Sequence, residues 1–218
     1  AQYAVDALLE AGLDRIVANV SHLPEICTAA LQRLHVGSAR LQISDESQEL
    51  LGSAGGLKQA LAHLGSAPFV VLNADVISGI DLRGLLFAHE RGRERHGVMM
   101  TLALHEPIRG GHYREIRLSP DSGLVEGYGE VRENVPFFSG AAIIEPGALA
   151  ALIPGAAAEF VPSLLEPWVR KQKVAGYYFK EEWFDVGSPQ HWRDTHLSLL
   201  RALETGRLSG RIRKRIES

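Results

Sequence analysis

Phe69-Val70-Val71-Leu72-Asn73-Ala74-Asp75 is a continuous apolar run that ends at a polar turn and an aspartate. Runs of four to eight apolar residues are typical of a central strand buried on both faces. Strand-like and helical patterns alternate around it, with strands expected at 15–20, 39–44 and 98–104 and helices at 4–9, 24–34, 57–64 and 81–95. This alternation predicts a three-layer α/β/α, Rossmann-like fold with a mixed, mainly parallel sheet.

The second half of the chain has a different pattern, without a linker or an internal repeat. We expect a hairpin over 113–127, strands at 137–144 and 174–180, and helices at 160–171 and 189–203. Residues 1–205 are therefore predicted to form a single domain. Residues 206–218 form a short basic tail, for which a solvated helix or a frayed end is the simplest expectation.

Composition excludes several classes of protein. A length of 218 residues is enough for one domain with a sizeable core. The formal net charge of −3 gives no reason to expect nucleic acid as a partner. There is no apolar run of 18 residues that would indicate a membrane span, and a lone cysteine, Cys27, cannot form an intramolecular disulfide. These features are compatible with a cytoplasmic protein and leave the oligomeric state open, a homo-oligomer included.

A second aspartate lies far along the chain in Trp183-Phe184-Asp185-Val186-Gly187-Ser188-Pro189. Like Asp75, Asp185 follows an apolar, strand-like run. Each aspartate taken alone could simply cap a turn. Two carboxylates brought together at the carboxyl edge of an α/β sheet make a Mg²⁺ site, because Mg²⁺ takes one or two protein carboxylates and fills its other positions with water and phosphate.

A glycine-rich turn, Gly52-Ser53-Ala54-Gly55-Gly56, precedes the first aspartate. No Gly-Lys-[Ser/Thr] follows, so it is not a P-loop, and it does not match the GxGxxG pattern. Small residues here could permit a tight strand-to-helix connection. They could equally let a flat nucleobase approach backbone N–H and C=O groups.

In combination, these segments resemble the sugar-1-phosphate nucleotidyltransferases, which join an NTP to a sugar 1-phosphate and release pyrophosphate. Glu49–Leu57 is similar to the family's nucleotide-base loop, and Val70–Asp75 is similar to the strand whose aspartate binds Mg²⁺. Trp183–Pro189 is similar to the segment that supplies the second metal ligand. The resemblance extends over residues 1–200, and the short bacterial enzymes of the family are the most similar in length.

The resemblance implies a role for each matched residue. Asp75 and Asp185 would be the catalytic metal ligands. The nucleotide would be held by Gly52, Ser53, Ala54, Gly55, Gly56 and Asn73, and the sugar by Arg114, Glu126, Ser139 and Gly140. Arg114 stands where the family has a glycine. The family's first strand and its Gly-x-Gly-x-Arg-x-x-Pro phosphate loop have no counterpart in these residues, so we expect the domain to lack both.

Two other functions fit parts of the same pattern. A non-catalytic relative that binds nucleotide sugars as a regulatory or scaffold subunit would explain the missing phosphate loop, but it need not keep both aspartates. A nucleotide-sugar-dependent glycosyltransferase would usually carry Asp-x-Asp at the metal strand. Here the residue two before Asp75 is Asn73, which favours the nucleotidyltransferase.

Overall fold

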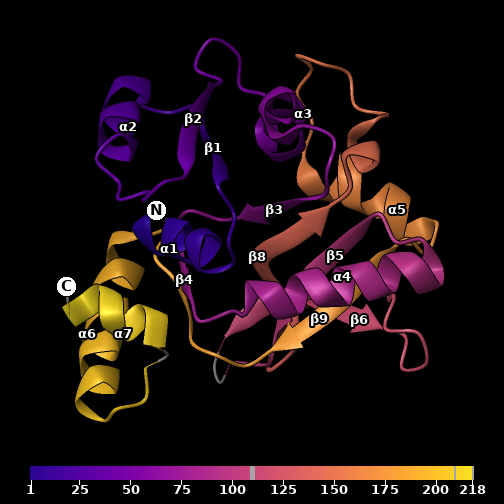
Figure 1. Cartoon of the computed structure of the whole chain (residues 1–218). Coiled ribbons are helices and arrows are strands. Elements are labelled where there is room, and N and C mark those ends of the chain that lie inside the picture. Colours follow the sequence, from indigo (N-terminus) through magenta and orange to yellow (C-terminus); the bar gives the residue numbers. More distant parts are fainter. Residues whose placement is uncertain (109–110, 209, 218) are drawn as a thin grey trace.

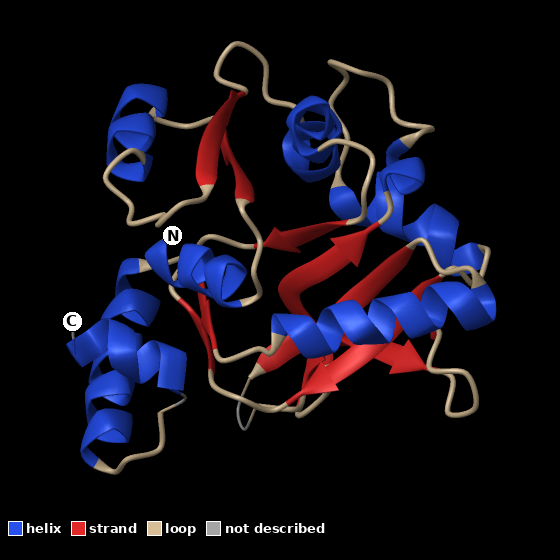
Figure 2. Ribbon diagram, viewed as in Figure 1, coloured by secondary structure: helices blue, strands red, loops and turns tan. Residues whose placement is uncertain are grey.

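The computed structural model describes residues 1–108, 111–208 and 210–217. A mixed six-stranded sheet forms its centre (Figures 1 and 2). The strand order is β7-β6-β8-β5-β9, and β3 also pairs with β8. β8 is antiparallel to β3, β5 and β6, whereas β5 and β9 are parallel. The strands of this sheet are β3 (Phe69–Leu72), β5 (Met100–His105), β6 (His112–Leu118), β7 (Val125–Glu133), β8 (Phe137–Ile144) and β9 (Val174–Phe179). Four strands thus run in one direction, and β7 and β8 run against them.

Helices cover both faces of this sheet, which confirms the three-layer prediction. α1 (Gln2–Glu10) and α4 (Leu82–His96) pack on one face through a cluster that includes Leu82, Leu85 and Ile143. The other face is covered by α3 (Gly52–Leu64), η1 (Pro146–Leu149), the π-helical segment η2 (Phe160–Leu165) and α5 (Glu166–Arg170). Both faces of β8 and β5 are consequently buried, which is why these strands are mostly apolar and do not alternate with exposed polar residues.

A smaller unit lies beside the central sheet. β1 (Arg15–Val20) and β2 (Arg40–Asp45) form a parallel pair, with α2 (Pro24–Leu31) as the connection between them. β1 is not hydrogen-bonded to β3. A cavity of about 840 Å³ lies between the two units, lined by residues of β1, α3 and β3 and also by Asn73 and Asp75.

Two short strands that the sequence did not predict position the aspartates. β4 (Val76–Ser78) and β10 (Trp183–Asp185) form an antiparallel pair in which Asp185 is opposite Val76. Three residues are too few to show a period-2 pattern. The pairing joins segments more than a hundred positions apart and places the residue before β4, Asp75, beside the end of β10.

The C-terminal segment packs against the domain, contrary to the expected solvated or frayed end. α6 (Pro189–Glu204) begins at a side-chain cap on Ser188, and α7 (Gly210–Glu217) follows it. Ile212 of α7 is fully buried, and Arg215 donates hydrogen bonds of 2.6 and 2.7 Å to the two carboxylate oxygens of Asp6 in α1. The alternation of basic and apolar residues is the signature of an amphipathic helix with a docked face.

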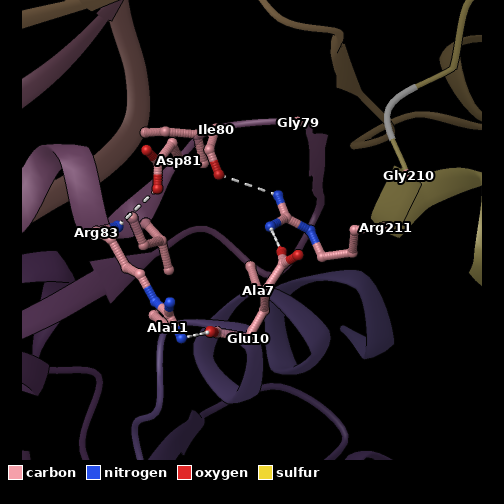
Figure 3. A pocket seen from close by; sticks show the side chains of 10 residues that line it. Ala7, Glu10, Ala11, Gly79, Ile80, Asp81, Arg83, Gly210 and Arg211 are labelled. Atoms are coloured by element: carbon pink, nitrogen blue, oxygen red, sulfur yellow. Dashed lines mark hydrogen bonds and ion pairs between the residues drawn. The ribbon is translucent and has the colours of Figure 1, made fainter.

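A pocket of about 390 Å³ lies where α7 meets α1 and the start of α4 (Figure 3). Its cationic side chains are already engaged. Arg211 is paired with Glu10 and donates to the carbonyl oxygens of Ser78 and Ile80, at 2.8 and 3.1 Å. Arg83 donates to the carbonyl oxygen of Glu10 at 2.9 Å. We therefore interpret this pocket as part of the structural contact of α7 with α1 and α4.

Within the described residues, no helix is long and apolar enough to cross a membrane.

Candidate active site

Asp75 and Asp185 converge on one point of the structure, as their positions in the sequence predicted. Oδ2 of Asp75 and Oδ1 of Asp185 lie 3.2 and 3.0 Å from the position that a Cβ atom on Gly187 would occupy. The N–H of Gly187 donates a 2.8 Å hydrogen bond to Oδ1 of Asp185, which fixes that carboxylate. The Val186 N–H donates to the carbonyl oxygen of Asp75 at 2.8 Å. A backbone register, rather than side-chain packing, thus aligns the two carboxylates.

The carboxylate pair fits the donor set of a hydrated Mg²⁺ ion. Asp75 is exposed and the Asp185 side chain is 41% exposed, so both can reach a solvent-borne ion and its phosphate ligands. Among the residues that the structure describes, no group of three or more His, Cys, Asp or Glu side chains could hold a metal. Two carboxylates without a protein cage match Mg²⁺, which keeps several waters and binds substrate phosphates.

His191 borders the pair and was not singled out by the sequence. His191 lies in the first turn of α6, and its Nδ1 is 3.7 Å from Oδ2 of Asp185. The signal in the sequence that could have identified His191 was its short spacing from Asp185, with the tight Gly187-Ser188-Pro189 turn between them. A histidine six residues after an aspartate has no specific meaning until that turn and the helix start are known.

Aromatic rings form one wall near Asp185. Tyr113 of β6 stacks on Phe137 with a centroid separation of 3.8 Å, and it meets the edge of Trp183 at 5.6 Å. Burial, followed by the negative charge of Asp185, raises the pKa of the Tyr113 phenol above its ordinary value. Trp183 is held by a 2.8 Å hydrogen bond from its Nε1 to the Ser139 carbonyl oxygen. The wall is therefore rigid on the side of the site formed by β6, β8 and β10.

The structure brings Asn73, Ser139 and Gly140 together beside the aspartates. Gly140 has φ +86°, and a Cβ there would lie 2.8 Å from Cγ of Asn73. The Asn73 N–H also donates to the Gly140 carbonyl oxygen at 2.9 Å. Ser139 is 3% exposed, and its hydroxyl donates to the Ala103 carbonyl oxygen, so the side chain supports β8 from within. Any contact of Ser139 with a sugar would have to use its backbone.

Arg114 and Glu126 do not lie together in the hairpin. Arg114 is exposed on β6, next to Tyr113 in sequence. Glu126 is exposed near the opposite end of the hairpin, six positions along β7 from Arg132, the residue paired with Tyr113. At about 3.3 Å per residue this is roughly 20 Å of strand. The sequence could not reveal this separation, because the bulges in the hairpin set its register.

The glycine-rich turn forms the first turns of α3, and its glycines allow close contacts within the protein. A Cβ on Gly55 would lie 2.8 Å from the Ala156 carbonyl oxygen. The N–H groups of Ala54 and Gly55 both donate to the Ala158 carbonyl oxygen, at 2.8 and 3.0 Å. The Ser53 hydroxyl donates to Glu159 and accepts from the Phe160 N–H. The small residues of this turn thus permit close packing against the 156–160 segment, which is a different role from the tight strand-to-helix connection considered from the sequence. Contact of the turn with a nucleobase stays a prediction.

Comparison with known proteins assigns this chain to a family, although no family model matches it. N-acetylmuramate alpha-1-phosphate uridylyltransferase of Caulobacter vibrioides is 33% identical over 199 residues, covering 86% of this chain and 78% of the relative. The enzyme of the same name from Neisseria meningitidis serogroup B is 30% identical over 182 residues, covering 83% and 76%. This chain is a sugar-1-phosphate nucleotidyltransferase by family. Mannose-1-phosphate guanyltransferase of Aspergillus fumigatus matches this nucleotidyltransferase at 34% identity over 112 residues, 50% of this chain and 30% of the relative.

Solved structures support the fold of the nucleotidyltransferase. HddC from Yersinia pseudotuberculosis superposes with a TM-score of 0.72 at 17% identity, over 88% of this chain and 82% of HddC. An apo UDP-glucose pyrophosphorylase gives a TM-score of 0.68, also at 17% identity, over 92% and 86%. At this identity the likeness concerns the fold alone.

Proposed function

We propose that this nucleotidyltransferase joins an NTP to a sugar 1-phosphate, giving an NDP-sugar and pyrophosphate. The convergence of Asp75 and Asp185 carries the proposal, together with family membership. In this reaction a phosphate oxygen of the sugar 1-phosphate attacks the α-phosphorus of the NTP. One P–O bond forms, the bond from that phosphorus to the bridging oxygen breaks, and pyrophosphate leaves with the electron pair.

No strong general base is required, because the attacking phosphate is already anionic. Catalysis then depends on alignment and on neutralising the charge of the phosphates. Asp75 and Asp185 would hold a divalent cation, which when bound acts as a template and Lewis acid for the phosphates. The Gly187 N–H keeps the Asp185 carboxylate turned toward Asp75. The backbone hydrogen bond from the Val186 N–H to the Asp75 carbonyl oxygen keeps the two aspartates next to each other.

We propose the large cavity as the path along which the nucleotide binds. Asn19 of β1 and Asp75 both line it, so it extends from the β1–β2 unit to the first aspartate. We place the nucleoside toward β1 and α3 and the phosphates at Asp75. The sugar 1-phosphate would approach from the side of Tyr113 and Trp183, near Asp185. Arg114 would contact the sugar 1-phosphate on this side of the site. Glu126 lies near the other end of the hairpin, so it would have to contact a different part of the substrate.

The test is release of pyrophosphate from panels of NTPs and sugar 1-phosphates, with and without Mg²⁺. Asp185→Asn keeps the shape of the side chain and removes the negative charge, so we expect a rate loss of about a hundredfold or more. Asp194→Asn, an exposed position on α6, is the matched control and should leave the rate unchanged. Release of nucleoside diphosphate from an NDP-sugar in the presence of an acceptor alcohol, with no pyrophosphate from the NTP panel, would identify a glycosyltransferase. Full activity of folded Asp185→Asn would remove the carboxylate pair from the mechanism.

A further inference from the structure

His105 is a buried histidine behind the aromatic wall of the site. It is the last residue of β5 and is 8% exposed. Its Nδ1 lies 2.7 Å from the carbonyl oxygen of Glu106, and its Nε2 lies 2.9 Å from the carbonyl oxygen of Glu181. Glu181 follows β9, in the turn that leads into β10. One imidazole ring therefore bridges the end of β5 and the turn that leads to Asp185.

Both contacts of the His105 ring require a hydrogen-bond donor on the histidine, because a carbonyl oxygen only accepts. A neutral imidazole carries one N–H and one lone pair, whichever tautomer forms. One of the two carbonyl oxygens would then face that lone pair. The imidazolium form carries an N–H on each nitrogen and satisfies both contacts. The geometry thus fits a His105 ring that is protonated on both nitrogens.

The aromatic rings around His105 also favour its positive charge. Phe179 on β9 meets the imidazole in a T-shaped arrangement with a centroid separation of 4.9 Å, and the Phe137 ring on β8 lies 5.6 Å away. A cation within about 6 Å of an aromatic centroid is attracted by the electron-rich ring face. Burial opposes any charge, so the imidazolium depends on these rings and on the two carbonyl oxygens together.

Several titratable groups lie on the elements that pack around His105. The acidic ones favour a positive charge on the imidazole, and the one lysine opposes it. Histidine is the side chain whose charge ordinarily changes between pH 5 and 8, so a response of this region near neutral pH points to the imidazole. The groups are Glu106 after β5, Lys180, Glu181 and Glu182 after β9, Asp185 on β10 and Tyr113 on β6.

The His105 bridge reaches Asp185 through a short stretch of backbone. The turn at 180–182 is held on one side by His105 and on the other by the Gly79 N–H, which donates to the Glu182 carbonyl oxygen at 2.7 Å. The next three residues are β10, which pairs with β4 and ends at Asp185. Loss of one of the two His105 hydrogen bonds would therefore loosen the start of β10 and the carboxylate at its end.

We propose that doubly protonated His105 is a positioning residue that holds Asp185 in the metal pair, an inference that rests on the function proposed above. When the ring loses a proton, one hydrogen bond is lost and a lone pair faces a carbonyl oxygen. Cation affinity should consequently be highest while His105 is charged and fall as the pH rises through its titration. The competing interpretation is a neutral ring that only packs, in which case cation affinity does not follow the protonation of His105.

The experiment follows two quantities in the full chain between pH 6 and 8. Nitrogen-15 NMR of the His105 ring reports its protonation, because the two nitrogens are alike in imidazolium and differ strongly in a neutral ring. Paramagnetic resonance measures Mn²⁺ affinity. We expect this affinity to fall about tenfold over the interval in which the His105 signals change, as for other groups that orient metal ligands. Loss of charge from His191, which faces Asp185, would raise the affinity, so it cannot produce the fall.

Three variants separate the hydrogen bonds from the packing. His105→Phe keeps an aromatic ring against Phe137 and Phe179 but has no N–H, so we expect about tenfold weaker Mn²⁺ binding at pH 6 and no further fall toward pH 8. His105→Gln keeps a donor and should recover part of the affinity. His22→Phe, at an exposed position, is the matched control and should keep both the affinity and its pH dependence.

The outcomes that overturn the proposal are specific. A His105 ring that is neutral at pH 6 does so, as does an Mn²⁺ affinity that stays level while His105 titrates. Full affinity in folded His105→Phe also does so. If His105→Phe does not fold, the pH series on the unmodified chain and on His105→Gln still decide. Mn²⁺ binding that is independent of His105 contradicts this inference alone, whereas a chain that binds no Mn²⁺ at any pH contradicts the proposed metal pair as well.

Discussion

The N–H of Val186 donates a 2.8 Å hydrogen bond to the carbonyl oxygen of Asp75, and this bond joins two segments that are far apart in the chain. It extends the β4–β10 pairing by one residue, so Asp75 and Asp185 flank the same short ladder. The site is consequently assembled on paired backbone. Rotation of the Asp185 side chain is restricted as well, because the Gly187 N–H donates to its Oδ1.

Gly187→Ala should weaken metal binding. The added Cβ would lie 3.0 Å from Oδ1 of Asp185 and 3.2 Å from Oδ2 of Asp75, so both carboxylates must shift. Changes to groups that orient metal ligands typically cost about 10- to 100-fold in metal affinity. Titration with Mn²⁺ followed by paramagnetic resonance measures this directly, without turnover. Gly210→Ala, where a Cβ meets nothing within 4 Å, is the control. Unchanged Mn²⁺ affinity in Gly187→Ala would show that this turn does not set the site.

Gly55→Val should destabilise the protein whether or not nucleotide is present. A Cβ at this position would lie 2.8 Å from the Ala156 carbonyl oxygen and 2.9 Å from Cβ of Leu51. Overpacking of this kind costs about 1–3 kcal/mol. The urea midpoint measures the effect, and Gly210→Ala again serves as the control. A variant as stable as the unmodified chain would mean that the 156–158 segment can move away freely.

His89 should make the protein less stable in mild acid. It is 2% exposed and contacts Oγ1 of Thr101 at 2.9 Å and Oε1 of Glu145 at 3.2 Å. Burial lowers the pKa of His89, which outweighs the opposite effect of Glu145. The unfolded chain then binds a proton at higher pH than the folded one. The contribution of His89 is complete above the unfolded pKa of about 6.5 and is lost progressively as the pH falls toward the lowered folded value.

The measurement is the free energy of unfolding between pH 7.5 and 5. We expect His89→Gln to be less stable at neutral pH but to have a shallower decline toward acid than the unmodified chain. His22→Gln, at an exposed position, should keep the original slope. Identical slopes in all three proteins would mean that His89 does not control the acid response.

Ile212→Ala should loosen the C-terminal helix. Ile212 of α7 is fully buried in the cluster that contains Ile77 and Leu199. Removing a buried Ile side chain costs about 2–5 kcal/mol. Thermal unfolding measures this, with Lys214→Ala as the exposed control in the same helix. Because Arg211 also donates to the carbonyl oxygens of Ser78, the last residue of β4, and of Ile80, we expect Mn²⁺ affinity to fall as well. Equal stability of the two variants would contradict a docked α7.

The sequence by itself determined the layers of this protein. Strands at 15–20 and 137–144 were predicted with the bounds that the structure has, because their apolar patterns follow local periodicity. The helix predicted at 81–95 forms at Leu82–His96, where Asp81 caps its first turn. The two metal-binding candidates were also recognisable, since an aspartate at the end of an apolar run is a local pattern.

Only the tertiary structure decided how these pieces meet. The β4–β10 pairing depends on partners more than a hundred residues apart, and segments of three residues carry too little periodicity to predict it. The register of the β6–β7 hairpin is set by bulges, so the distance of Glu126 from Tyr113 could not be inferred from spacing. Burial of Glu46 against Gly56 requires β1, β2 and α3 to be in place. A polar residue acquires its role from what surrounds it, and long-range packing sets those surroundings.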